Sequence, residues 1–168
     1  KVSNHMSTLS VDTIQGQTTA ANVKFPAGTT LQVVEATSST DESSATTSFH
    51  NTTISATITP KFNNSIIKVE CLFHFHQKSN DNGADVQLVR DVGGSITNLT
   101  GSSQDFYIRQ HTNDADFFYF PVMLYATDTP ATTSARTYRL RAKSTGSNGY
   151  EIFNNRGKGR MILTEIAV

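Results

Sequence analysis

The sequence predicts an all-β fold, an antiparallel β-sandwich or jelly-roll-like domain. Segments that alternate between apolar and polar residues recur along the chain, and turn-forming residues separate them roughly every 8–12 residues. No long stretch shows the 3.6-residue period of an amphipathic helix. The chain has 168 residues, which is enough to bury one core of its own.

The chain divides into three regions. Residues 1–6, Lys-Val-Ser-Asn-His-Met, read as an expression scar followed by the start methionine. Residues 7–28 are predicted to be an N-terminal attachment or oligomerisation segment with a linker, because their few apolar residues stand in a polar setting and Phe25-Pro-Ala-Gly28 forms a turn. Residues 29–168 are predicted to form the β-sandwich.

The first half of this domain contains three predicted strands. Thr29–Thr37 places Leu31 and Val33 on one face, and the Ser/Thr-rich Ser38–Ser48 is expected to be an exposed loop. Two further strands have clean alternation, with inward faces formed by Ile54, Ala56 and Ile58 in Asn51–Thr59, and by Ile67, Val69, Cys71, Phe73 and Phe75 in Ile66–His76. Pro60 ends the earlier of the two, because proline cannot donate to a strand ladder.

The second half continues the pattern. A turn at Ser79–Gly83 leads into Ala84–Val92, and short strands are expected around Ile96–Leu99, Phe106–Arg109 and Tyr150–Phe153. Thr133–Lys143 alternates Tyr138, Leu140 and Ala142 with charged or hydroxyl residues, and Arg160–Val168 stays apolar to the last residue. We therefore expect the carboxy-terminal segment to be a strand inside the core.

One segment breaks the alternation. Phe117–Tyr125 has large apolar residues at both parities, as a strand covered on both faces would have. In a small two-layer domain the second cover usually comes from another subunit, so this segment predicts oligomerisation, and the alternative is a central strand covered by a loop of the same chain. The predicted interface residues are Phe117, Phe118, Tyr119, Phe120, Val122 and Leu124.

Composition and motifs limit the classes of function. Basic and acidic residues balance at 14 each, without the clustered positive charge that a nucleic-acid partner demands. No apolar run approaches the ~20 residues of a membrane-spanning helix, and the sequence contains no nucleotide, phosphate-loop or nucleophile-elbow motif. We therefore expect a protein without a cofactor, with no nucleic-acid partner, no membrane insertion and no enzymatic activity.

Few side chains are candidates for a site. His74 and His76 lie two apart on one strand face, a spacing that can chelate a metal, although two histidines on a solvent-exposed face explain the same pattern. Asp41-Glu42 and the Asp114/Asp116 pair have the residue types for glycoside cleavage but stand in polar loops, which indicates ordinary surface acids. Tyr107 and Arg109 are candidate receptor contacts, as an aromatic ring and a forked donor suited to a sugar.

Several segments together resemble one family. Ser7-Thr-Leu-Ser-Val-Asp-Thr-Ile-Gln15 is similar to the opening of tail-fibre and other virion structural proteins from marine bacteriophages, with Ser10 where lysine is usual. Further similarity lies in Pro26–Thr37, Ile54–Pro60, Ser65–Val69, Leu88–Asp91, Ala131–Tyr138 and Ile162–Ala167. The segments occur in order and span nearly all of residues 7–168.

The resemblance implies an extracellular virion protein, located in a phage tail or fibre and usually a homotrimer. Its amino-terminal segment would join other virion proteins, and its globular domain would bind a bacterial surface glycan or protein. The resemblance implies no catalytic residue. A purely structural decoration or adaptor protein is the alternative, and a polysaccharide depolymerase is a further one.

Overall fold

The computed structural model describes residues 25–77, 83–101, 106–109, 119–152, 154 and 157–168. These ranges contain no helix, and hence none long and apolar enough to cross a membrane. Their strands are β1 (Thr30–Ser38), β2 (Glu42–Ser44), β3 (His50–Ile58), β4 (Ile66–Gln77), β5 (Gly83–Val92), β6 (Ser95–Asn98), β7 (Phe106–Arg109), β8 (Tyr119–Asp128), β9 (Arg136–Ser144), β10 (Tyr150–Ile152) and β11 (Gly159–Ile166).

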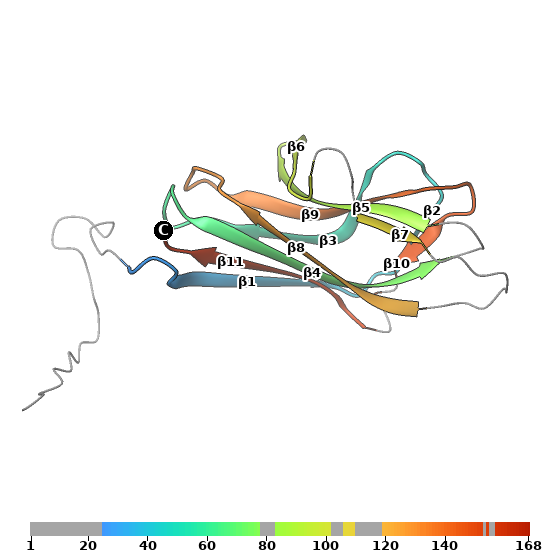
Figure 1. Ribbon diagram of the computed structural model, residues 1–168, viewed down its shortest axis with the longest axis horizontal. Coiled ribbons are helices and arrows are strands. Elements are labelled where there is room, and N and C mark those ends of the chain that lie inside the picture. Colours follow the sequence, from blue (N-terminus) through green and yellow to red (C-terminus); the bar gives the residue numbers. More distant parts are fainter. Residues whose placement is uncertain (1–24, 78–82, 102–105, 110–118, 153, 155–156) are drawn as a thin grey trace, which may run out of the picture.

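The strands form two antiparallel sheets that face each other (Figure 1). In sheet A, β8, β4, β11 and β1 lie side by side, while the short β10 pairs with the end of β4 and β2 pairs with β10. In sheet B, β3, β9 and β5 lie side by side, and β6 and β7 pair with successive parts of the other edge of β5.

The strand order is that of a jelly roll. β1 pairs with β11, β3 with β9, β4 with β8, and β5 with β6 and β7, so the first half of the chain pairs with the second half taken in reverse. Taken from the chain ends inward, these pairs lie alternately in sheet A and in sheet B. The predicted all-β fold, an antiparallel β-sandwich or jelly-roll-like domain, is confirmed.

The core consists of the inward faces that the alternation predicted. The apolar set of β4, Ile67 to Phe75, is fully buried, and so is the set Tyr138, Leu140 and Ala142 of β9. Met161 and Leu163 of β11 complete the layer from sheet A, which confirms that the carboxy-terminal segment is a core strand. Burial raises the pKa of the Cys71 thiol far above its usual range, so this cysteine behaves as a small apolar residue.

Two predictions for the first half of the domain were wrong. In β1 the residues that pack on the core are Val34 and Ala36, and Val33 faces outward with 58% of its surface exposed. The apolar pair Val33-Val34 fits either parity, so the sequence did not fix which residue faces in. Ser38–Ser48 is also more than an exposed loop, because it contains β2.

The two ends of the sandwich differ. The terminal end holds the start of β1 and the carboxy terminus, which are joined because the Gly28 N–H donates to the Ala167 carbonyl at 2.9 Å and the Ala167 N–H donates to the Thr29 carbonyl at 2.9 Å. The opposite end, which we call the loop end, holds the β1–β3 connection with β2 and the β9–β11 connection with β10 (Figure 1). Phe25 therefore enters the sandwich at the end remote from β2 and β10.

A charged group links the two sheets. Arg90 of β5 binds both carboxylate oxygens of Asp128 of β8 at 2.7 Å, and the Tyr138 hydroxyl of β9 donates to the same carboxylate at 2.8 Å. Burial, followed by the Asp128 carboxylate, raises the pKa of Tyr138 well above its usual range. The carboxylate of sheet A thus receives donors from two strands of sheet B.

Candidate functional site

The loop end is built on two three-residue strands. β2 pairs with β10, and β10 pairs with the end of β4, so both connections are held against sheet A. The β9–β10 connection comes close to the end of β2 at Gly149. This position requires glycine, because its φ is +84° and a Cβ there would lie 2.7 Å from the Ser44 carbonyl oxygen. The Ser44 and Thr46 hydroxyls accept N–H groups two residues further on, which shapes the rest of the connection.

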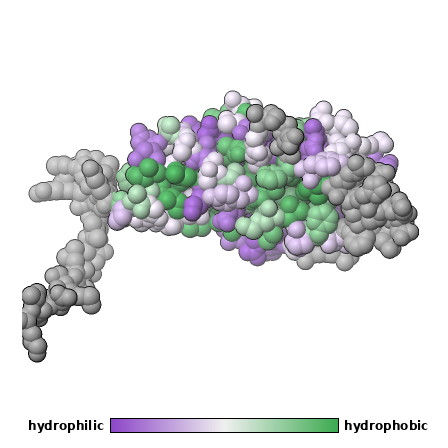
Figure 2. All heavy atoms as spheres, viewed as in Figure 1, coloured by the Kyte–Doolittle hydropathy of each residue, from purple (hydrophilic) through white to green (hydrophobic). Residues whose placement is uncertain are grey.

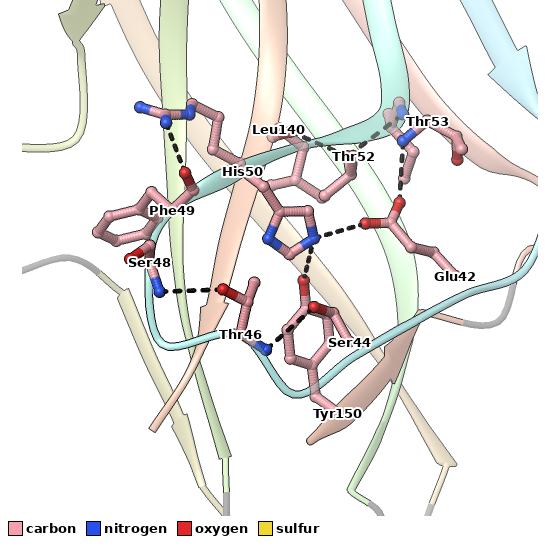
Figure 3. Close-up of polar contacts among 12 residues, drawn as sticks. Glu42, Ser44, Thr46, Ser48, Phe49, His50, Thr52, Thr53, Leu140 and Tyr150 are labelled. Atoms are coloured by element: carbon pink, nitrogen blue, oxygen red, sulfur yellow. Dashed lines mark hydrogen bonds and ion pairs between the residues drawn. The ribbon is translucent and has the colours of Figure 1, made fainter. Parts of the chain in front are cut away.

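A polar network fixes this connection to the core (Figure 3). The His50 Nε2 atom lies 2.9 Å from Glu42 Oε1 and 3.1 Å from the Tyr150 hydroxyl. The second oxygen of Glu42 accepts the Thr53 N–H at 3.0 Å. Glu42 therefore ties β2 to the first residues of β3, and Tyr150 adds β10 to the same group.

The chemistry of this network is structural. The Tyr150 side chain is fully buried, and burial, followed by the charge of Glu42, raises its pKa well above the usual range, so its hydroxyl stays protonated. The Asp41 carboxylate accepts the Asn154 N–H at 2.8 Å. Asp41 and Glu42 thus hold the loop end together, and the Asp114/Asp116 pair lies outside the described residues.

The predicted solvent-facing histidine pair is not formed. His76 is buried, its Nδ1 atom lies 2.8 Å from Glu151 Oε2, and the Tyr119 ring stacks on it with centroids 4.5 Å apart. His74 lies against Gly157, where a Cβ would come within 2.3 Å of its ring. The alternation placed both histidines on the outer face, but there the Tyr119 ring covers His76 and the chain at Gly157 covers His74. Within the described ranges, no three or more His, Cys, Asp or Glu side chains gather as a metal site.

The outer face of sheet B carries a row of four residues at the loop end, which we call the sheet B row: Phe49, Lys143, Asp85 and Tyr107. Asp85 of β5 lies opposite Tyr107 of β7 on one side and opposite Lys143 of β9 on the other. The Lys143 Nζ atom is 3.0 Å from the Asp85 carboxylate and 4.7 Å from the centre of the Phe49 ring. Tyr107 stands at the open end of the row with 53% of its surface exposed.

A second cation supports the row. The Arg141 guanidinium lies 5.8 Å from the centre of the Phe49 ring and donates to the Phe49 carbonyl at 2.8 Å. This places two cationic side chains near the ring of Phe49, the last residue before β3. Of the predicted receptor contacts, Tyr107 belongs to the row, whereas Arg109 closes β7 opposite Gly83 and its side chain lies outside what the structure describes.

The described residues of the predicted oligomer interface divide between the two faces of β8. Leu124 is buried in the core, and Phe120 and Val122 pack against that core, so these three face inward. Their cover comes from the same chain, because the core on which they pack is formed by the chain's own two sheets. Tyr119 does face outward, 46% exposed, and Phe117 and Phe118 lie outside the described residues.

The outward residues of β8 form a second exposed surface, which we call the β8 face: Tyr119, Met123 and Tyr125 with Leu72 of β4. Met123 lies directly opposite Leu72 in the strand register. The exposed fractions are 64% for Met123, 50% for Tyr125 and 37% for Leu72. Apolar residues reach the surface on the side of the sandwich where β8 crosses the front (Figure 2).

Comparison with known proteins adds little to these observations. No protein-family description matches the chain, and no curated protein matches it. Among solved structures, the crystal structure of the infectious bursal disease virus VP2 subviral particle matches with a TM-score of 0.37 and 14% identity. The match covers 82% of this chain and 37% of that chain. A likeness at this level carries no argument about function.

Proposed function

We propose that this chain is a structural protein of a virion that attaches to a bacterial surface by binding a glycan, without catalysis. Two features support the proposal: the sequence resemblance to marine phage virion proteins, and the separation of the two ends of the sandwich. Residues 25–28 enter at the terminal end, which suits attachment to other virion proteins. The sheet B row lies at the opposite end.

The sheet B row is the observation that carries the proposal. It offers an exposed aromatic ring, a carboxylate and an ammonium group in one line across neighbouring strands. Tyr107 and Phe49 are three inter-strand spacings apart, ~14 Å, which is the length of a short oligosaccharide. Aromatic rings take the apolar face of a sugar, and fixed charged groups bind its hydroxyls, so the row has the parts that a glycan site needs.

Binding of the full chain to immobilised bacterial surface polysaccharides tests the proposal. We expect the Tyr107→Ala and Lys143→Ala variants to bind at least about tenfold more weakly, which corresponds to ~1.4 kcal/mol per lost contact. Lys68→Ala is the matched control, because Lys68 is an exposed lysine on sheet A. Binding that is unchanged in both row variants, or no binding by the unaltered protein, would contradict the proposal.

The β8 face favours a second candidate, a structural decoration or adaptor protein without a receptor. Such a protein needs an exposed apolar surface for assembly, and Met123, Tyr125 and Leu72 provide one. In this case the protein adsorbs to no bacterial cell or glycan, while variants of the β8 face change its incorporation into particles.

A further inference from the structure

We infer that two copies of this chain associate by antiparallel pairing of their β8 strands about a two-fold axis, joining two copies of sheet A into one continuous sheet. The inference is independent of glycan binding. It rests on the backbone edge of β8, on the side chains of the β8 face and on the symmetry of a strand paired with itself.

The open backbone edge of β8 follows from the register. Ala167 directs both its N–H and its C=O toward β1, to Thr29 and Gly28. The backbone N–H and C=O groups of neighbouring residues in a strand point to opposite sides, so the even-numbered residues of β11 bond to β4. Their partners in β4 are also even-numbered, which leaves the odd-numbered residues of β4 to bond to β8. In β8 the even-numbered residues therefore bond to β4. The odd-numbered ones, from Pro121 to Thr127, point their backbone groups away from β4, to an edge that pairs with no other strand in the described part of the chain.

Pro121 agrees with this assignment. It is an odd-numbered residue of β8, and proline occurs in sheets where no N–H is needed for the ladder. Within the described residues β8 pairs only with β4, so the N–H groups of Met123, Tyr125 and Thr127 and the carbonyls beside them face away from the sheet. The same odd-numbered residues carry the exposed side chains of the β8 face.

The edge carries one of the usual protections against pairing, the proline Pro121 near one end, but lacks the other, a charged side chain. Natural edge strands are commonly guarded by charged side chains, yet the outward residues of β8 are Tyr119, Pro121, Met123, Tyr125 and Thr127, without a charge among them. The opposite edge strand of sheet A, β1, carries Glu35, which pairs with Arg160 at 2.9 Å. The zero net charge of the chain adds no repulsion between two copies.

A second β8 fits this edge because the strand is complementary to itself. With the two-fold axis beside Leu124, Met123 of each copy lies opposite Tyr125 of the other, and both are outward residues. Pro121 then lies opposite Thr127, so each Pro121 removes only one donor from the new ladder. Two β8 faces become one continuous apolar surface, in which cross-strand aromatic and aliphatic side chains contact each other.

Edge-to-edge pairing leaves the outer faces of the two β8 strands on one surface, so the copies bury the backbone edge and the flanks of β8 and not the whole of the exposed side chains. Strand addition at a sheet edge draws its affinity mainly from main-chain hydrogen bonds, and the neighbouring side chains add specificity. The backbone edge of β8 therefore carries the association, and the apolar side chains beside it support it.

The mass of the full chain in solution tests the inference. We expect a dimer that Met123→Lys converts to a monomer of unchanged circular dichroism, because a lysine there puts two like charges at the axis. Val33→Lys is the control, since Val33 is similarly exposed on the other edge strand, and it leaves the dimer intact. A monomeric or trimeric unaltered protein, or a dimer that only Val33→Lys disrupts, would overturn the inference.

A cysteine pair tests the register. A mixture of Met123→Cys and Tyr125→Cys chains is expected to form a disulfide-linked dimer on oxidation, because directly opposed, hydrogen-bonded residues lie ~5.5 Å apart at Cα. Each variant alone forms less of it, and the buried Cys71 does not compete. If neither variant nor the mixture cross-links although the unaltered protein is dimeric, the copies meet elsewhere and the inference fails.

Discussion

Glu165 is the side chain whose loss we expect to destabilise the sandwich most clearly. It is fully buried at the terminal end of β11 and binds four donors from other segments. Its Oε1 atom accepts the Lys61 N–H at 2.7 Å, the Phe62 N–H at 3.2 Å and the Ser65 hydroxyl at 2.6 Å, and its Oε2 atom accepts the Gln32 amide. One carboxylate thus holds the whole β3–β4 connection.

The size of the effect follows from the donors left without an acceptor. A buried donor that loses its partner costs ~1–3 kcal/mol, and Glu165→Ala removes the acceptor from three donors in one turn, part of which water can reach. We expect a loss of about 3–5 kcal/mol in the free energy of unfolding, or roughly 10 °C in melting temperature for a domain of this size. Urea unfolding and calorimetry measure both quantities.

Two further variants separate the causes. Glu165→Gln keeps a carbonyl oxygen for the three donors, while its new NH₂ group meets the Gln32 amide, so its cost should be about 1 kcal/mol. Glu35→Ala removes a surface carboxylate from the same sheet and should cost less than about 0.5 kcal/mol. If Glu165→Ala costs no more than Glu35→Ala, the carboxylate does not hold the connection. If Glu165→Gln costs as much as Glu165→Ala, its charge matters more than its acceptor atoms.

Three other predictions concern single contacts. The hydrogen bond from the Gly94 N–H, followed by that from Arg139, lowers the pKa of Asp91 in the folded protein. Asp91 therefore stabilises the fold at a pH above the carboxyl pKa of the unfolded chain, about 4, and this contribution is lost as the pH falls through the lower pKa of the folded state. Asp91→Asn should be less stable than the unaltered protein at pH 7 and equally stable in strong acid. Gly149→Ala should cost more than Gly28→Ala, since both have positive φ but only Gly149 is crowded, and equal melting temperatures would contradict this. Tyr138→Phe should cost about 1 kcal/mol in urea unfolding, because Asp128 keeps Arg90.

The sequence predicted those strands whose two faces differ. In β4 and β9 large apolar residues alternate with polar ones, and the pleat converts that alternation directly into a buried and an exposed face. In β8 and β1 apolar residues stand at both parities, so the same rule gives no face. For Phe120 and Met123 the answer depended on where β8 lies in the sheet, which is a property of the whole topology.

The structure of the loop end could not be predicted from the sequence for a different reason. β2 and β10 have three residues each, too few to show a period, and they form because each is held by a neighbour. His50 contacts Glu42 eight positions away but Tyr150 a hundred positions away. Phe49 and Lys143 become neighbours only through the register of β3 and β9, so sequence spacing could not predict the sheet B row. The alternation in β9 did place Lys143 on the solvent-facing side of the strand.

The two proposed surfaces make a joint prediction, because their geometry relates them. A two-fold axis perpendicular to sheet A reverses the strands, so the loop ends of the two copies point in opposite directions. The outer face of sheet B keeps its direction, and both sheet B rows therefore face the same side. Two copies can bind one surface through these faces, although not through the tips of their loops.

Met123→Lys tests this relation. Two linked sites gain effective concentration and can raise apparent affinity by ~10²–10⁴ when both engage together. We expect the monomeric variant to bind a glycan-coated surface at least about tenfold more weakly, while its affinity for the free oligosaccharide in solution stays unchanged because Met123 lies on the other sheet. A loss of affinity for the free sugar, or full retention of surface binding by the monomer, would show that the two surfaces do not act together.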